Sequence, residues 1–251
     1  MASAALANSS PAVRYWAAKT IRLKRQEISG LPAVRNTMLR ALGQAAIRET
    51  DDPALREIYV TLDFTQVLER VPFAEELLRV FVDILEARGQ RYVDGTVTVS
   101  EADTVALVAM GRLAVPMNSD AQADRRRRYL TALAQMLCRI VDGYVGQLEI
   151  EEASKRDLAL IRRCFLAVRE IEKELRRVVG EAGVKTETMP NLLLKMQGAN
   201  TEEIVRERNR WCGWPPNERG VLNEKPFDVP LGAGFAEAGT PPAGTPSSEP
   251  K

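Results

Sequence analysis

Apolar residues recur at helical spacing through most of the chain before residue 212. They follow the i, i+3, i+4, i+7 rule, which places them along one side of an α-helix. One such stripe lies in residues 55–62, a second in 77–85, a third in 130–148 and the longest in 158–178. The pattern therefore predicts an all-α fold in which each helix buries one apolar stripe.

One passage departs from helical spacing. From Tyr92 to Val99 apolar and polar residues alternate, and Asp94-Gly95 is a pair typical of tight turns. We expect a small hairpin or an ordered loop here. Two short strands do not make a sheet, so the predicted class remains all-α.

The composition changes near residue 213. Eight of the 14 prolines and six of the 16 glycines lie from Cys212 onward. We therefore expect a helical-repeat or bundle domain over residues 1–213 and an extended to disordered Pro/Gly-rich tail over 214–251. The first part of this tail has apolar residues that could pack over the helices as an extended strap, namely Trp214, Leu222, Phe227, Val229 and Leu231.

Three prolines at equal spacing begin similar phrases. Pro11, Pro32 and Pro53 lie 21 residues apart, and each is followed by Ala, then Val or Leu, then Arg. Proline is favoured at the first position of a helix, so we expect each to begin one, with Ser10 and Asp52 as N-caps. Each unit is then one helix plus a turn. Two units give a period near that of two-helix repeats, which is typical of α-solenoids.

The repeated phrases resemble HEAT-type repeats. The residues that carry this resemblance are Pro11-Ala12-Val13-Arg14 with Ala17, Ala18 and Ile21, and Val34-Arg35 with Ala41-Leu42-Gly43. It covers residues 10–88 and implies a short solenoid of antiparallel helix pairs, a fold that mostly serves as a protein-binding scaffold. The spacing changes after Arg88, and the helices expected near 120–148 and 152–182 are longer. They either cap a short array or form an irregular bundle.

The composition excludes several kinds of chemistry. The chain has no histidine, which removes the Ser-His-Asp triad and every His-ligated metal site. Its three cysteines, Cys138, Cys164 and Cys212, are too far apart for a CxxC motif. Carboxylates cluster at 51–52 and 149–152, where we expect helix starts that favour negative charge. We therefore expect no catalytic, cofactor-binding or metal-binding residue, and a protein that is not an enzyme.

Two groups of residues are candidates for partner binding. Arg125, Arg126, Arg127 and Arg128 form the densest basic run, which is either a site for an anionic partner or a solvated helix start, because four consecutive residues spread around a helix. Arg14 and Tyr15 lie in the first helix. We expect Trp16 to pack inward there, which leaves Arg14 and Tyr15 on an exposed end face.

These observations favour a non-catalytic scaffold that binds another protein, or a second copy of itself, through an exposed helix face. Two alternatives stay open: an enzyme or small-molecule regulator with an Asp/Glu/Arg site in a helical cavity, and an anionic-partner binder that uses Arg125–Arg128. The net charge of +1 gives nucleic-acid binding no support. No apolar run reaches the roughly 18 residues of a membrane span. We expect a cytoplasmic location, with an upstream targeting segment as the alternative.

Overall fold

The computed structural model describes residues 2–93, 100–113, 115–213 and 220–229. Within these ranges the regular structure is helical, as the sequence predicts. The α-helices are α1 (Ala2–Ala5), α2 (Pro11–Leu23), α3 (Arg25–Ser29), α4 (Pro32–Arg48), α5 (Asp52–Leu62), α6 (Ala74–Val93), α7 (Glu101–Leu113), α8 (Ala123–Leu148), α9 (Leu158–Glu181), α10 (Leu192–Gly198) and α11 (Thr201–Cys212). Short 3-10 turns are η1 (Phe64–Gln66), η2 (Asp120–Gln122), η3 (Ala153–Lys155), η4 (Thr186–Thr188) and η5 (Val221–Asn223).

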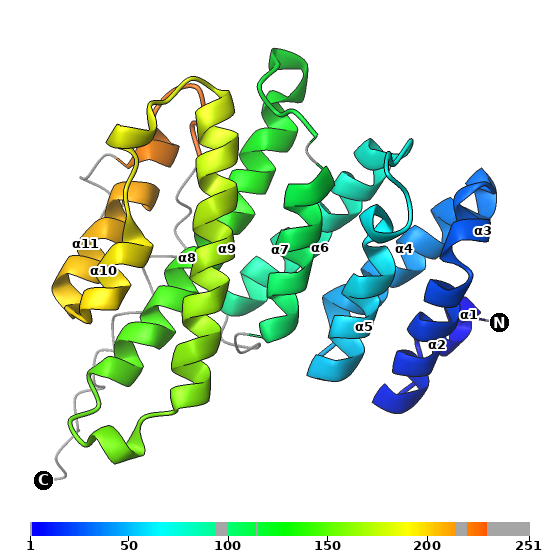
Figure 1. Cartoon of the computed structure of the whole chain (residues 1–251), viewed down its shortest axis with the longest axis horizontal. Helices are drawn as coiled ribbons and strands as arrows, with labels where there is room; N and C mark the ends of the chain where they lie inside the picture. The colour runs from blue at the N-terminus through cyan, green and yellow to red at the C-terminus, as the bar shows by residue number, and fades with distance from the viewer. Residues whose placement is uncertain (1, 94–99, 114, 214–219, 230–251) are drawn as a thin grey trace, which may run out of the picture.

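The longer helices pack in two rows. The first row is α2, α5, α7 and α9, in which each helix lies against the next. The second row is α4, α6, α8 and α11, again packed in that order. The chain alternates between the rows as it advances across the molecule, from α2 at one edge to α10 and α11 at the other (Figure 1). A helix inside a row therefore has a row neighbour on both sides, whereas α2, the first helix of its row, has a row neighbour on one side and also contacts the short helices α1 and α3.

The three repeated prolines lie where the sequence predicts. Pro11 and Pro32 are the first residues of α2 and α4, and Pro53 is the second residue of α5. The predicted caps differ in detail. Asp51, not Asp52, is the N-cap of α5, and its carboxylate accepts a hydrogen bond from the Ala54 N–H at 3.0 Å. Ser10 occupies the N-cap position of α2, but its side chain makes no capping hydrogen bond.

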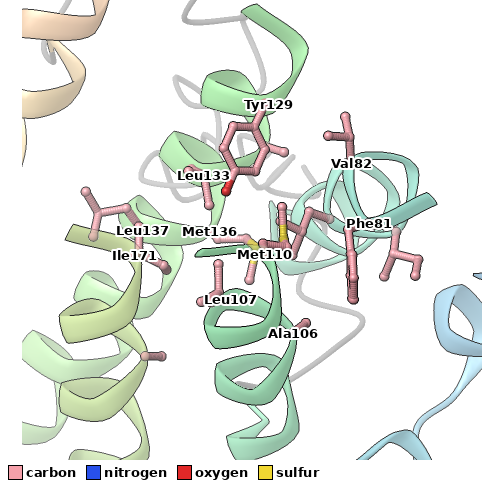
Figure 2. Close-up of a cluster of buried hydrophobic side chains, with 14 of the residues drawn as sticks. Phe81, Val82, Ala106, Leu107, Met110, Tyr129, Leu133, Met136, Leu137 and Ile171 are labelled. Atoms are coloured by element: carbon pink, nitrogen blue, oxygen red, sulfur yellow. The ribbon is translucent and has the colours of Figure 1, made fainter. Parts of the chain in front are cut away.

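One continuous hydrophobic core connects both rows. Its centre lies between α6, α7, α8 and α9, where side chains from four helices meet (Figure 2). The labelled members are Phe81, Val82, Ala106, Leu107, Met110, Tyr129, Leu133, Met136, Leu137 and Ile171. Each large side chain buried in this way stabilises the fold by about 1.5–3 kcal/mol. The predicted apolar stripes supply four of these residues, Phe81, Leu133, Leu137 and Ile171, whereas the members from α7 lie outside every predicted stripe. Most stripe residues are buried or half-buried. Leu158 is the exception, because it is the first residue of α9 and lies in solvent.

Two irregular passages have different outcomes. Tyr92 and Val93 belong to the last turn of α6, and the rest of the predicted hairpin, 94–99, lies outside the described residues. The strap is confirmed in part, since Leu222, Phe227 and Val229 are buried against the helices. Trp214 and Leu231 lie outside the described residues. The segment 220–229 therefore completes the core although its composition resembles the tail.

The acidic cluster at 149–152 does not begin the long helix expected there, although Glu152 occupies the N-cap position of the short 3-10 helix η3. Glu149 is the C-cap of α8, and Glu151 lies in the link that follows. The helix after this link begins at Leu158, where the Asp157 carboxylate caps it by accepting from the Leu160 N–H at 2.9 Å. In the part of the chain that the structure describes, no helix is long and apolar enough to cross a bilayer.

Candidate partner-binding face

One side of α2 attaches it to α5. Its small residues Ala17 and Ala18 are buried there together with Ile21, which lets the two helices approach closely. The Thr61 hydroxyl of α5 donates a hydrogen bond to the carbonyl of Ala18 at 3.1 Å. This side of α2 is therefore fully used in packing.

Three arginines border the same contact. Arg14 binds the Glu49 carboxylate through Nε and Nη2, each at 2.6 Å, and Arg22 Nε lies 2.5 Å from Glu57 Oε1. The Arg25 guanidinium is buried and donates to the backbone carbonyls of Val60 and Asp63, at 2.5 and 2.8 Å. Arg14 and Arg22 of α2, and Arg25 of α3, thus connect these helices to α5 and to the residues at its ends. Arg14, a candidate for partner binding, is thus occupied inside the molecule.

The short helices α1 and α3 also contact α2, but another side of α2 is left exposed in the described chain. We call this side the outward face of α2 and define it by Val13, Trp16, Thr20 and Leu23, all of which are exposed. Their spacing of three, four and three residues places them in one stripe along the helix. In α5 and α7 the corresponding side packs on the preceding helix of the row. The outward face is therefore an open end of the first row.

Exposed apolar side chains concentrate in this part of the molecule. Eight large apolar side chains of the described residues are exposed, and five of them lie between residues 13 and 34. These five are Val13, Trp16, Leu23, Leu31 and Val34. Single exposed apolar residues are normal on protein surfaces, but the other parts of the described chain show no such concentration.

The prediction that Trp16 packs inward is wrong, since 59% of its surface is exposed. Trp16 precedes Ala18 by two residues, which corresponds to about 200° around the helix axis, so the two cannot face the same way. The small residue fills the inward position instead. Trp16 packs edge-on against Tyr15, with ring centroids 5.6 Å apart, and the Lys19 ammonium lies 4.6 Å from the Trp16 centroid. Tyr15 itself is half-buried.

The N-terminal helices are strongly basic. Residues 1–48 contain eight basic residues and one acidic residue, Glu27, while the chain as a whole has a net charge of +1. The basic residues are Arg14, Lys19, Arg22, Lys24, Arg25, Arg35, Arg40 and Arg48. The remainder of the chain is correspondingly acidic. Analysis of the total charge missed this asymmetry because the two parts cancel, although a count by segment would have found it.

The four arginines at the start of α8 point to different partners within the molecule. Arg125 binds Glu75 of α6, and Arg128 binds Asp83 and Glu86 of the same helix at 2.9 and 2.5 Å. The hydrogen bonds that Arg128 donates to Glu86 and Asp83 raise its pKa further above the usual range. The other two members, Arg126 and Arg127, point elsewhere.

Arg126 is buried and donates to the Met117 carbonyl at 2.9 Å and to the Pro226 carbonyl at 3.2 Å. Arg127 pairs with Asp124 of its own helix at 2.9 Å. Arg125 and Arg128 therefore join α8 to α6, Arg126 joins it to the strap, and Arg127 pairs within α8, so the four do not form one basic patch.

A shallow pocket of about 380 Å³ lies where α2, α5 and α7 meet. Its lining residues include Tyr15, Asp52, Arg56, Glu57 and Glu101. Glu57 already pairs with Arg22, which limits its availability to a ligand. In the described ranges, no group of three or more Cys, Asp or Glu side chains is placed to hold a metal ion.

Comparison with protein-family models, curated proteins and solved structures gives no match for this chain. Its interpretation therefore depends on the geometry and charge described above. Of the sequence-predicted candidates, Tyr15 lies beside the outward face of α2, whereas Arg14 and the four arginines of α8 pair within the molecule.

Proposed function

We propose that the protein is a non-catalytic helical-repeat scaffold, a short α-solenoid that binds another protein through the outward face of α2. The observation that carries this proposal is the concentration of exposed apolar side chains on residues 13–34. A stacked array leaves each terminal helix with one unpartnered side, and such sides are normally polar in isolated arrays. Here that side carries Val13, Trp16 and Leu23 instead.

The two-row order supports a repeat interpretation. With the five-residue helix α3 set aside, every second helix along the chain joins the same row, from α2 through α5 and α7 to α9. This is the arrangement that stacked helix pairs produce. The HEAT-like phrases at Pro11 and Pro32 begin the first helix of each row.

A photo-crosslinking experiment tests this function. We would replace Leu23 with p-benzoylphenylalanine in the full chain and irradiate it in an extract of the organism that encodes it. Leu158 is a matched control, because 71% of its surface is exposed against 74% for Leu23 and it lies on a distant helix. We expect a discrete protein adduct from position 23 that is lost when Trp16→Ser is added. Adducts of equal yield from both positions, or none from position 23, would contradict the proposal.

A further inference from the structure

The outward face of α2 has the geometry of a missing row neighbour. Val13, Trp16, Thr20 and Leu23 alternate at three- and four-residue steps, the spacing at which one helix receives the side chains of another. Another side of α2 packs against α5, the next member of the row. A helix laid on the outward face would therefore continue α9, α7, α5 and α2 with one further member.

Basic residues border this stripe on both sides. Lys19 lies one turn from Trp16 and covers its ring, and in the described chain no carboxylate lies within 4 Å of its ammonium. Lys24 follows Leu23 directly. Its pairing with Glu27 at 3.0 Å is between two side chains that are each more than half exposed, which makes it a weak interaction. Both ammonium groups are thus available to a partner.

The contact between α2 and α5 shows which kind of surface the basic side chains of α2 pair with. There the basic residues Arg14 and Arg22 meet the carboxylates Glu49 and Glu57 around a small apolar centre. The outward side repeats this plan, with apolar residues in the middle and lysines at the edges. Its complement is a helix with an apolar stripe bordered by Asp or Glu.

We propose that the outward face of α2 binds an acidic amphipathic helix of a partner protein, which extends the first row by one helix. This inference rests on the proposed scaffold function and names the chemistry of its partner. Charge argues against a second copy in this position, because a two-fold contact would bring the Lys19 and Lys24 side chains of both copies together. Phosphate-rich ligands are disfavoured because Arg14, Arg22 and Arg25 are all engaged by acceptors inside the molecule.

The test uses two labelled helical peptides of roughly 21 residues, or about six turns. Both carry the same Leu/Ala stripe, bordered by Glu in one peptide and by Lys in the other. Fluorescence anisotropy with the full chain at near-physiological salt gives their affinities. We expect the Glu peptide to bind at least about tenfold more tightly than the Lys peptide.

Matched variants locate the binding. Lys19→Glu removes a cation beside the stripe, and Lys185→Glu makes the same charge change at an exposed position in the link between α9 and η4. Leu23→Ser and Leu158→Ser form a second pair, with nearly equal exposure. We expect Lys19→Glu and Leu23→Ser each to lower the affinity for the Glu peptide by about tenfold. Both control variants should bind the peptide with the affinity of the parent chain.

Four results would overturn the inference. They are equal affinity for the two peptides, no binding of the Glu peptide, equal losses in the controls, and a dimer in sedimentation experiments that Leu23→Ser dissociates. Tighter binding to phosphatidylserine vesicles than to the Glu peptide would likewise assign the face to a membrane surface. If the peptide fails while position 23 still crosslinks to a protein, the scaffold function stands and only the acidic-helix inference is lost. If both fail, both proposals are wrong.

Discussion

The Arg88 guanidinium holds the Asp103 carboxylate with two hydrogen bonds, Nε to Oδ1 at 2.8 Å and Nη2 to Oδ2 at 3.0 Å. Both residues are 1% exposed. The Tyr59 hydroxyl donates to the same Oδ1 at 2.8 Å, and Arg88 Nη1 donates to the Glu49 carbonyl at 3.2 Å. The pair therefore joins α5, α6 and α7 to the end of α4 and fixes how the two rows meet.

Asp103→Ala should destabilise the protein by about 3–5 kcal/mol, because it leaves the Arg88 charge buried without its partner. Replacing both residues, with Arg88→Met and Asp103→Leu, should cost much less, since no charge is then buried alone. Urea unfolding followed by circular dichroism measures both values. The exposed pair Arg127–Asp124 is the control, and Asp124→Ala should cost less than about 1 kcal/mol. Equal losses of unfolding free energy at the two sites would show that the buried network does not hold the two rows together.

The attachment of α2 should weaken in acid. Burial acts to raise the pKa of Glu49, but hydrogen bonds from Arg14 and from the backbone N–H groups of Asp51 and Thr50 outweigh it and hold the pKa below its ordinary 4.5. A carboxylate with a lowered folded-state pKa stabilises the fold above its unfolded pKa, and the contribution is lost as the pH falls through the folded value.

Glu49→Gln removes this titration, so its free energy of unfolding should fall less than that of the parent chain between about pH 6 and pH 3. Urea titrations at several pH values measure the difference. Glu187→Gln, at an exposed position, is the control and should follow the parent chain. Parallel pH profiles for Glu49→Gln and the parent would contradict the role assigned to the Arg14–Glu49 pair.

Glu172→Ala should loosen the C-terminal helices. The buried Glu172 carboxylate accepts hydrogen bonds from the N–H groups of Leu192 and Leu193, both at 2.9 Å, and from Trp211 Nε1 at 3.2 Å. Its loss leaves these donors without their acceptor, at about 1–3 kcal/mol for each of the two that are fully buried, the Leu192 N–H and Trp211 Nε1. Hydrogen–deuterium exchange should become faster over residues 192–212 and stay unchanged in α2. Unchanged exchange in α10 would show that its start is held by other contacts.

The cysteines should resist thiol reagents in the folded protein. Cys138, Cys164 and Cys212 are all buried. Contact with Cys138 and burial raise the pKa of Cys212 well above 9.0, and burial raises that of Cys164 to about 11. The reactive thiolate is therefore scarce near neutral pH. Titration with Ellman's reagent at pH 8 should detect almost no thiol until guanidinium is added, and all three cysteines afterwards. Rapid reaction of the native chain would contradict the packing of α11 on α8.

Local features of the chain were readable from the sequence. Proline fixes a backbone torsion and lacks an N–H, so Pro11, Pro32 and Pro53 predict helix starts without reference to distant residues. Helical periodicity in 130–148 and 158–178 predicts which side of a helix is buried for the same local reason. The failed expectations concern orientation and connection: Trp16 lies outward, and Glu149 ends a helix instead of beginning one.

The sequence by itself determined that this chain is helical, where its repeated helices begin and which chemistries it lacks, because these depend on residue type and on spacing within a few turns. Only the tertiary structure decided which charges remain available. In the sequence, Arg14 and Arg128 cannot be told apart from an arginine that has no partner. In the structure, each binds a carboxylate that lies 35 or more residues away along the chain. Lys19 meets none in the described chain. Whether a charged side chain pairs inside the molecule or stays accessible to a partner depends on how the rows stack, and that packing is a property of the whole chain.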